Sequence, residues 1–324
     1  MNSSLSQIAK TLFSDSLLPD ELEATLKSYK SLLLNSTELD LNDQCNKVDI
    51  ELQNGIAIGL SWAASCLDDS IRTLKFLRGT KQAIETKLKE SASVHLLYAG
   101  TGPFATLILP LLSHFSSNQL QVTLLDVNPT SVENVTQLID RFNFKNHVQE
   151  IRCADATKTT FEKASEFDIL LSETMQHALQ SELQVVITSH LLNQMEADTI
   201  LIPQSIELGI VSANSDSMKV QHVDHFLKVD AHFLRSHRDI QAGWYIEQRI
   251  DSKKLQFRAN ELLAISTKIQ VHENEQIEWN ESGLTTLKII GVPEDFQNTN
   301  EVAIRYVISP EPGCVIYTDR LQIT

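Results

Sequence analysis

The chain has 324 residues, of which 42% are hydrophobic and 21% are charged, and its formal net charge at pH 7 is −15. This length accommodates two domains, or one large domain with an appendage. The acidic balance opposes nonspecific binding to nucleic acid or to an anionic membrane surface. The negative charge suits a soluble enzyme and mildly favours a cationic substrate. A role in solubility alone explains the charge equally well.

The sequence carries no clear targeting or redox signal. No stretch approaches the ~18 apolar residues that a membrane span requires. Residues 1–6 lack the basic and apolar regions of a signal peptide, so we expect a cytoplasmic protein. The cysteines form no C-x-x-C pair, which indicates neither a zinc knuckle nor a disulfide framework. We therefore expect reduced, mostly buried thiols.

Residues 1–93 predict an N-terminal helical segment or lid. Leu18-Pro19-Asp20-Glu21 is typical of a helix start, because proline suits the first turn and acids favour the positive end of the helix dipole. Apolar residues then repeat at helical spacing. A polar loop follows at 35–49, and two more helices are expected at 56–67 and 69–88.

From residue 94 the pattern changes to strand, turn, helix, which predicts βαβ units and a parallel sheet. The glycine turn is followed by a helix in which Pro110 should produce a kink. The expected strands lie at 96–99, 120–125, 148–152, 167–171 and 200–202, and the expected helices at 104–112, 129–142 and 182–195.

Beyond residue 204 apolar and polar residues alternate, which predicts antiparallel strands in a sandwich or barrel. Residues 216–240 are irregular, and we expect a helical insert there. We place the domain boundary near Pro203, with domains at 1–93, 94–203 and 204–324. The expected strands of the last domain lie at 206–211, 262–271, 285–290, 302–308 and 314–323.

A glycine turn joins the first strand of this pattern to its helix. The apolar run 96–99 leads into Gly100-Thr101-Gly102, and Pro103 suits a first helical position. Bare backbone amides at a helix N-terminus can hold a nucleotide-like ligand. The spacing from Gly100 to Ala105 also satisfies the dinucleotide fingerprint with alanine in the third place. A purely structural glycine turn would look the same, so the ligand stays open.

Two acids follow neighbouring strands. Asp126 ends the second strand, 24 residues after Gly102, where a carboxylate can accept hydrogen bonds from both ribose hydroxyls. Asp155 ends the third strand, where an acid can hold the exocyclic amine of adenine. Each acid has a structural alternative as a helix cap, and Asn128 competes with Asp126 for that role.

The chain resembles the class I S-adenosylmethionine-dependent methyltransferases in the order of Gly100-Thr101-Gly102, Asp126, Asp155 and residues 168–173. More narrowly, Asp69-Ser70-Ile71-Arg72-Thr73-Leu74, Ser172-Glu173-Thr174-Met175, Glu182 and the β-rich end resemble the protein arginine N-methyltransferases. The resemblance implies a Rossmann-like domain of the seven-stranded type, a helical segment before it and an antiparallel β-barrel-like domain after it. It also implies S-adenosylmethionine as cofactor and S-adenosylhomocysteine as product.

The resemblance assigns roles to individual positions. Arg72 is expected to hold the carboxylate of the methionine moiety, and Glu173 and Glu182 are expected to be catalytic. The expected cofactor-binding residues are Arg72, Tyr98, Gly100, Thr101, Gly102, Asp126, Val127, Asp155, Ala156 and Glu173.

The two glutamates have a chemical rationale. Methyl transfer from a sulfonium is an in-line displacement that depends mainly on positioning. Guanidinium is a poor nucleophile because its charge is delocalised. Carboxylates at Glu173 and Glu182 would hold that charge on one side and leave the other nitrogen more nucleophilic. The structural alternative for Glu182 is an acid in the first turn of a helix.

The sequence departs from the family at several places. Tyr98 replaces an acid, Phe104 replaces the third glycine, and Thr174 replaces a tryptophan. The Thr-His-Trp triplet is absent, with Gly243-Trp244 as the nearest remnant. We therefore expect N-methylation of a small molecule, which is free arginine, a guanidine-bearing metabolite or another small molecule. Alternatives are a protein arginine methyltransferase, a catalytically silent cofactor-binding scaffold and an NAD(P)-dependent oxidoreductase.

The histidines and the partners complete the sequence predictions. His177 is either a base or an exposed residue of its loop. His222, His225, His232 and His237 lack companion ligands, so they predict a polar helical face and not a metal site. The family dimerises through an arm on its β domain, so residues 216–240 are the candidate arm of a homodimer.

Overall fold

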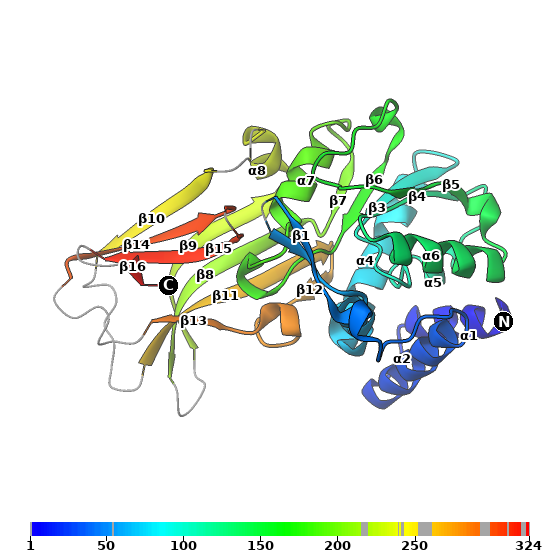
Figure 1. The fold of residues 1–324 in the computed structure, drawn as a ribbon, viewed down its shortest axis with the longest axis horizontal. Helices are drawn as coiled ribbons and strands as arrows, with labels where there is room; N and C mark the ends of the chain where they lie inside the picture. The colour runs from blue at the N-terminus through cyan, green and yellow to red at the C-terminus, as the bar shows by residue number, and fades with distance from the viewer. Residues whose placement is uncertain are drawn as a thin grey trace.

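In the computed structural model a parallel sheet lies among helices in the right-hand part of the view, and antiparallel strands lie to its left (Figure 1). The strand order is β5-β4-β3-β6-β7, so the order reverses at β3. The strands are β3 (Val94–Ala99), β4 (Leu120–Asp126), β5 (Val148–Cys153), β6 (Ile169–Ser172) and β7 (Ile200–Ile202). The structure describes residues 2–53, 55–214, 220–238, 240, 243–251, 261–291, 299–309, 311–318 and 322–323. Within them the parallel sheet has five strands, which confirms the predicted α/β fold.

Four helices accompany this sheet: α4 (Ser70–Lys87), α5 (Leu109–His114), α6 (Pro129–Arg141) and α7 (Gln184–Leu192). The prediction of a helix directly after the glycine turn is wrong. Residues 102–108 form turns, with positive φ at Gly102 (59°) and Ala105 (45°). Pro110 therefore lies at the start of α5, where its missing N–H is harmless, and does not kink it.

The N-terminal segment is less helical than predicted. Helices α1 (Asn2–Leu12) and α2 (Pro19–Leu34) lead to the short 3-10 helix η1 (Gln44–Lys47). The predicted helix at 56–67 is partly wrong, because β1 (Ile50–Leu52) and β2 (Gly55–Ala57) form an antiparallel hairpin. Helix α3 covers Leu60–Ser65, and η2 (Cys66–Asp68) leads into α4.

Two antiparallel sheets form the C-terminal β region, as the alternating pattern predicted. In the first, the strand order is β12-β11-β8-β9 and β13 also pairs with β11. In the second, the order is β10-β14-β15-β16. The strands are β8 (Ser205–Asn214), β9 (Val220–Asp230), β10 (Tyr245–Asp251), β11 (Glu261–His272), β12 (Glu275–Ile277), β13 (Lys288–Gly291), β14 (Glu301–Val307), β15 (Gly313–Thr318) and β16 (Gln322–Ile323).

The helical insert expected at 216–240 is mostly wrong. Residues 220–230 belong to strand β9, and only the short helix α8 (Ala231–Ser236) follows it. Arg235 donates hydrogen bonds to the carbonyl oxygens of Leu192 and Met195 and so covers the end of α7. Residues 216–219 and 239 of the predicted insert lie outside the described residues. The described part of the candidate arm therefore packs on its own chain.

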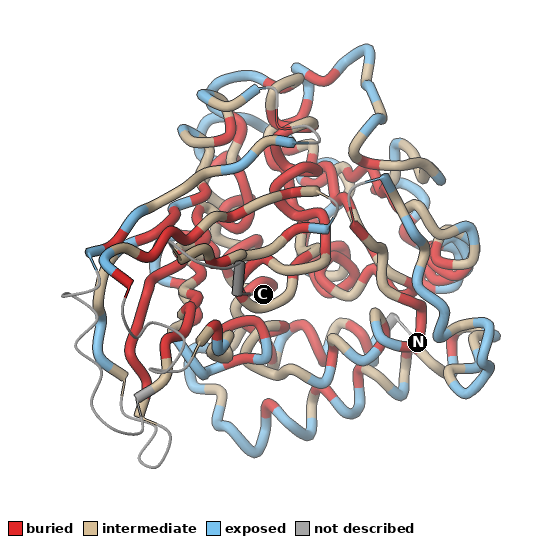
Figure 2. Tube along the Cα trace, turned by 60° about the vertical axis from the view of Figure 1, so that its left-hand side comes forward, coloured by how far each residue is buried: buried red, intermediate tan, exposed pale blue. Residues whose placement is uncertain are grey.

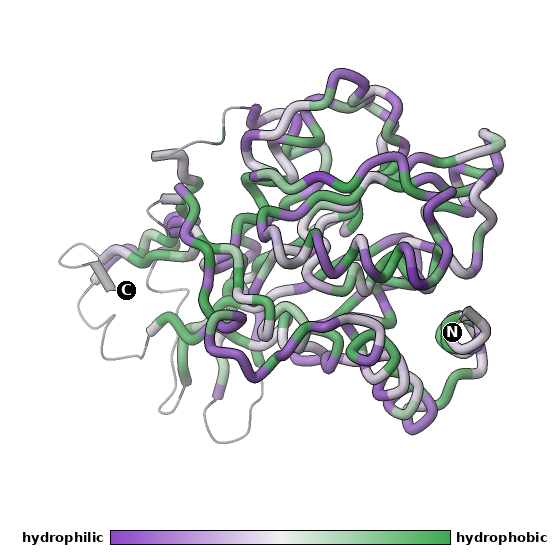
Figure 3. The backbone as a smooth tube through the Cα atoms, turned by 45° about the vertical axis from the view of Figure 1, so that its right-hand side comes forward, coloured by the Kyte–Doolittle hydropathy of each residue, from purple (hydrophilic) through white to green (hydrophobic). Residues whose placement is uncertain are grey.

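One connected core joins these parts (Figure 2). Figure 3 shows that hydrophobic residues gather along the strands and that hydrophilic residues gather on the outer turns. Gly79 lets α4 approach strand β11 closely, since a Cβ there would lie 2.6 Å from Val271 Cγ1. Helix α4 thereby links the parallel sheet to the β region. Among the described helices, none has both the length and the apolar character needed to cross a membrane.

Candidate functional site

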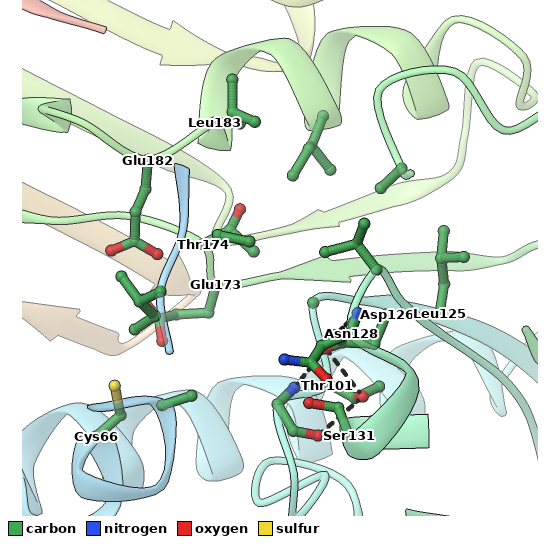
Figure 4. Close-up of a pocket in the computed structure, with 18 of the residues that line it drawn as sticks. Cys66, Thr101, Leu125, Asp126, Asn128, Ser131, Glu173, Thr174, Glu182 and Leu183 are labelled. Atoms are coloured by element: carbon green, nitrogen blue, oxygen red, sulfur yellow. Dashed lines mark hydrogen bonds between the residues drawn. The ribbon is translucent and has the colours of Figure 1, made fainter. Parts of the chain in front are cut away.

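An open cavity lies at the carboxyl ends of the parallel strands (Figure 4). The space between its walls is about 1040 Å³, a volume that includes open solvent. Its walls come from β3, β4, α3, η2, α4, the loop after β6 and the β1–β2 hairpin. All the predicted site residues line it: Arg72, Tyr98, Gly100, Thr101, Gly102, Asp126, Val127, Asp155, Ala156, Glu173 and Glu182.

The glycine turn forms part of the cavity floor. Gly100 and Gly102 have φ of 79° and 59°, a region that disfavours residues with a Cβ. A Cβ on Gly100 would lie 2.3 Å from Thr174 Cγ2, whereas one on Gly102 would lie 3.6 Å from Ala63 Cβ. Glycine at position 100 is therefore required by both the backbone and the neighbouring side chain.

Asp126 is buried beside this turn and is engaged by the backbone. Its Oδ2 accepts a hydrogen bond from the Gly102 N–H at 2.8 Å, and its Oδ1 accepts one from the Asn128 N–H at 2.9 Å. Burial raises the pKa of Asp126, although these hydrogen bonds oppose the rise. Asn128, and not Asp126, caps α6 by accepting a hydrogen bond from the Thr130 N–H.

Asp155 both lines the cavity and stabilises its own turn. Its Oδ1 accepts hydrogen bonds from the Thr157 N–H at 2.9 Å and from the Thr157 hydroxyl at 2.6 Å. Burial raises the pKa of Asp155, but the bonds from Thr157 and the nearby Lys158 outweigh it and leave the pKa below its usual value. The second carboxylate oxygen lies 3.2 Å from Lys158 Nζ.

Arg72 and Glu173 form an ion pair inside the cavity. Arg72 Nη2 donates to Glu173 Oε2, and the two side chains are 14% and 5% exposed. Glu173 Oε1 is buried without a hydrogen-bond partner. Asp69 positions Arg72 by capping α4: its Oδ1 accepts from the Arg72 N–H at 3.1 Å. A buried, unsatisfied carboxylate oxygen is costly, so this atom requires a donor from a ligand or from water.

Glu182 lies at the same end of the cavity as Glu173. Figure 4 places its carboxylate above Glu173, with Cys66 on the opposite wall. Burial raises the pKa of Glu182 to about 7, against opposing effects of Arg72 and Gln176. Since α7 begins at Gln184, Glu182 precedes the helix and is not an acid of its first turn.

Several lining residues escaped the sequence analysis. Cys66 lies near Arg72, and burial raises the pKa of its thiol. Ile56 and Ala57 contribute an apolar wall, and Ser131 lies beside Asp126. No sequence signal marks these positions, because they reach the cavity through tertiary contacts of short elements.

The departures from the family pattern have structural explanations. Tyr98 is buried, and burial raises the pKa of its hydroxyl. Phe104 is buried in the core and does not line the cavity. Thr174 donates from its N–H and hydroxyl to Gln184 Oε1 at 2.9 and 3.0 Å, which ties the loop after β6 to α7.

The histidines are not part of this cavity. His177 does not line it, and burial lowers its pKa. The prediction of a polar helical face is wrong for His222 and His225, which lie on strand β9. In the part of the chain that the structure describes, no group of acids, histidines and cysteines is arranged to hold a metal ion.

The strand order and the cavity at the strand ends are typical of the Rossmann-like fold that class I methyltransferases have. A solved structure with this fold is the Trypanosoma brucei PRMT1 enzyme-prozyme heterotetrameric complex with AdoHcy. The chain is 12% identical to it, with a TM-score of 0.52, over 80% of this chain and 94% of that chain. No protein-family model and no curated protein matches the sequence. The likeness therefore establishes the fold, including the β region that follows the parallel sheet.

Proposed function

We propose that this protein is an S-adenosylmethionine-dependent methyltransferase that N-methylates a small, guanidine-bearing acceptor. One observation carries the proposal: the glycine turn, the two strand-end acids, Arg72 and the two glutamates all line one cavity. An NAD(P)-dependent oxidoreductase would use the turn and Asp126, but it would leave Arg72 and the glutamates without a task. The fold of the PRMT1 neighbour, whose complex contains AdoHcy, supports the same choice.

The residues present fit the cofactor. The bare turn at Gly100 and Gly102 allows close approach to the backbone. Asp126 would hold the ribose hydroxyls, and Asp155 with Ala156 would hold the adenine. Arg72 keeps further guanidinium donors besides the one used by Glu173, so it would hold a carboxylate. Tyr98, Thr101 and Val127 would complete the wall around it.

The bound cofactor would supply a methyl group on a positively charged sulfur. The protein would supply positioning and electrostatics for the acceptor. Glu173 presents an unpartnered oxygen, Oε1, which would accept a hydrogen bond from a guanidinium N–H. Glu182, whose pKa is raised to about 7, would bind the same group and accept its proton near neutral pH.

The walls around the glutamates support a small acceptor. Leu52, Ile56, Ile58 and Leu183 make this end of the cavity apolar, which suits a compact molecule with one polar head. Thr174 stands at the tryptophan position of the protein-modifying family. A protein arginine methyltransferase remains the closest alternative, with the same chemistry and a larger acceptor.

A second candidate is a cofactor-binding subunit without turnover. The ion pair between Arg72 and Glu173 favours it, because each side chain already uses one polar atom on the other and not on a ligand. The replacement of the family's acid by Tyr98 also favours a subunit without turnover. This candidate shares the cofactor site with the main proposal and differs only in catalysis.

Methyl transfer from radiolabelled S-adenosylmethionine to arginine, ethylguanidine and a basic peptide tests the proposal. We expect transfer to a small guanidine and none to the peptide. Transfer to the peptide alone would overturn the small acceptor. Binding of S-adenosylhomocysteine without any transfer would support the silent subunit, and binding of NAD alone would exclude both.

Three further assignments belong to this proposal. The segments 1–93, 94–203 and 204–324 would act as lid, cofactor domain and substrate or dimerisation domain. A homodimer is the proposed assembly, which sedimentation velocity would test against a monomer. The proposed cytoplasmic location follows from the sequence alone and is tested by cell fractionation.

A further inference from the structure

The β1–β2 hairpin forms one wall of the cavity beside the catalytic glutamates. Its residues Leu52, Ile56 and Ala57, together with Ile58, line the cavity. These side chains are only half-buried, because one face of the hairpin looks into the empty space. In Figure 4 a blue strand from this part of the chain runs between Glu182 and Cys66. The hairpin thus occupies the side from which an acceptor would reach Glu182.

The hairpin is attached to the loop that carries Glu182. The Ile56 N–H donates to the Ser181 carbonyl at 3.2 Å, and Ile56 forms a parallel β-bridge with Glu182. The Ser181 N–H donates to the Pro312 carbonyl at 2.8 Å. Ser181 therefore uses both backbone groups, one toward the hairpin and one toward the β region.

At Gly55 the hairpin, the loop that carries Glu182 and the β region at Pro312 pack together without a gap. A Cβ there would lie 2.7 Å from the Ser181 oxygen, 3.0 Å from Pro312 Cδ and 3.1 Å from Leu183 Cδ2. Its φ of 148° is also unfavourable for other residues. Any side chain at this position would move the hairpin away from the loop.

The loop itself needs external support. Ala178, Leu179 and Ser181 are non-glycine residues with φ of 56°, 55° and 62°, and each such residue costs about 1–2 kcal/mol. The Ala178 N–H donates to Thr267 Oγ1 at 2.9 Å, and the Tyr306 hydroxyl donates to the Leu179 carbonyl at 3.3 Å. The hairpin and the Pro312 carbonyl support the loop at Ser181, next to Glu182.

We propose that the β1–β2 hairpin is the specificity-determining element of the acceptor site: it excludes polypeptides and, through Ser181, positions Glu182. This inference rests on the proposed methyltransferase function. Ile56 limits the size of the acceptor because its side chain lines the cavity while its backbone holds the loop. An acceptor with one guanidine head and a compact apolar body fits the remaining space.

Two variants separate the two tasks of the hairpin. Ile56→Ala enlarges the wall and keeps the backbone bond to Ser181. Gly55→Val separates the hairpin from Ser181, Pro312 and Leu183. Val48→Ala is the control, because Val48 is 66% exposed and lies just outside the hairpin. Thermal unfolding of each variant verifies that it folds, and Ile56→Val replaces Ile56→Ala if the latter does not.

The readouts are kcat/KM for ethylguanidine, a bulkier phenylguanidine and an arginine peptide, with the S-adenosylhomocysteine Kd measured alongside. We expect Ile56→Ala to shift the ratio of phenylguanidine to ethylguanidine by about tenfold or more at an unchanged Kd. Gly55→Val should lower kcat for every acceptor and displace the pH midpoint of kcat, whereas Val48→Ala should change nothing.

Two results would overturn the inference while leaving the methyltransferase intact. One is an unchanged selectivity ratio in Ile56→Ala together with an unchanged pH profile in Gly55→Val. The other is a wild-type protein that methylates the peptide as well as ethylguanidine. Absence of both cofactor binding and methyl transfer in the wild type would instead reject the proposed function, and the inference with it.

Discussion

Arg72 donates a hydrogen bond to Glu173 across 101 residues of sequence and thereby joins the first turn of α4 to the end of β6. Both side chains are largely buried. Breaking such a pair leaves an uncompensated charge, which typically destabilises a protein by 3–5 kcal/mol in a fully buried setting. This pair lines an open cavity, so solvent reduces the penalty.

Arg72→Met is expected to lower the free energy of unfolding by about 2 kcal/mol and to weaken S-adenosylhomocysteine binding. Chemical denaturation and calorimetry measure the two effects. Arg141→Met, on the outer helix α6, is the control and should alter neither. Full cofactor affinity in Arg72→Met would show that Arg72 holds only Glu173 and no ligand carboxylate.

Glu173→Gln is expected to retain S-adenosylhomocysteine binding and to lower kcat by about 100-fold or more. The amide still accepts from Arg72, but it removes the negative charge that would grip a guanidinium. Glu133→Gln, at an exposed position of α6, provides the matched control. Unchanged turnover in Glu173→Gln would refute the guanidinium clamp.

The raised pKa of Glu182 predicts how the stability of the protein depends on pH. Its pKa in the folded protein is about 7 and its ordinary value is 4.5, so the folded state binds more protons between these values. The contribution of Glu182 to stability therefore falls as the pH rises from about 4.5 to 7, at up to about 1.4 kcal/mol per pH unit. We expect the difference in unfolding free energy between Glu182→Gln and the wild type to shift in favour of the variant between pH 4 and pH 8.

The titration of Glu182 should also affect catalysis, where activity rises with pH although stability falls. If Glu182 accepts the proton of the acceptor, kcat/KM rises as the pH increases through about 7. A pH series on the wild type and Glu182→Gln measures it. A wild-type profile that is flat between pH 6 and 8 would contradict the role of Glu182 as a base.

The glycine turn offers a paired test of backbone and side-chain strain. Gly102→Ala meets only the unfavourable positive φ, which costs about 1 kcal/mol. Gly100→Ala meets the same strain and also Thr174 Cγ2, 2.3 Å from the new Cβ. We expect at least about twice the loss of stability in Gly100→Ala. Equal losses in urea denaturation would show that Thr174 moves freely.

Asp69 caps α4 and also links this helix to the β region. Its Oδ2 accepts from the Ser282 hydroxyl at 2.6 Å and from the Gly283 N–H at 2.8 Å. Asp69→Ala should cost about 2 kcal/mol, more than the ~1 kcal/mol of a simple cap. Asp230→Ala, which removes the cap of α8 and a 3.9 Å contact with the half-exposed Lys228, is the comparison. Equal losses in the two variants would contradict the additional role of Asp69.

The acids of the site were predictable because each follows a strand with a clear apolar pattern. Parallel strands end at one edge of the sheet, so Asp126, Asp155 and Glu173 had to meet there. The sequence only partly distinguished a ligand-binding acid from a helix cap. Asn128 caps α6, whereas Asp155 accepts a hydrogen bond from the Thr157 N–H in its own turn. The roles of these acids toward a ligand remain proposals.

The end of the cavity near Glu182 was less predictable because it depends on long-range contacts. The run 56–58 has no period that separates a helix from a strand. Pairing with β1 makes Gly55–Ala57 a strand, and the bridge from Ile56 to Glu182 adds to it. Cys66 reaches the cavity only because η2 joins α3 to α4 there. The helix expected after Gly102 fails because Ala105 also adopts a positive φ.

The affinity for S-adenosylhomocysteine, measured by titration calorimetry on the wild type and Asp126→Ala, tests the central claim most directly. The wild type should bind one equivalent. Asp126→Ala should lose about 100-fold or more in affinity, since two hydrogen bonds to a charged group disappear. Asp140→Ala, whose carboxylate is half exposed on α6, should bind like the wild type. No binding by the wild type, or equal binding by Asp126→Ala, would contradict the proposed cofactor site.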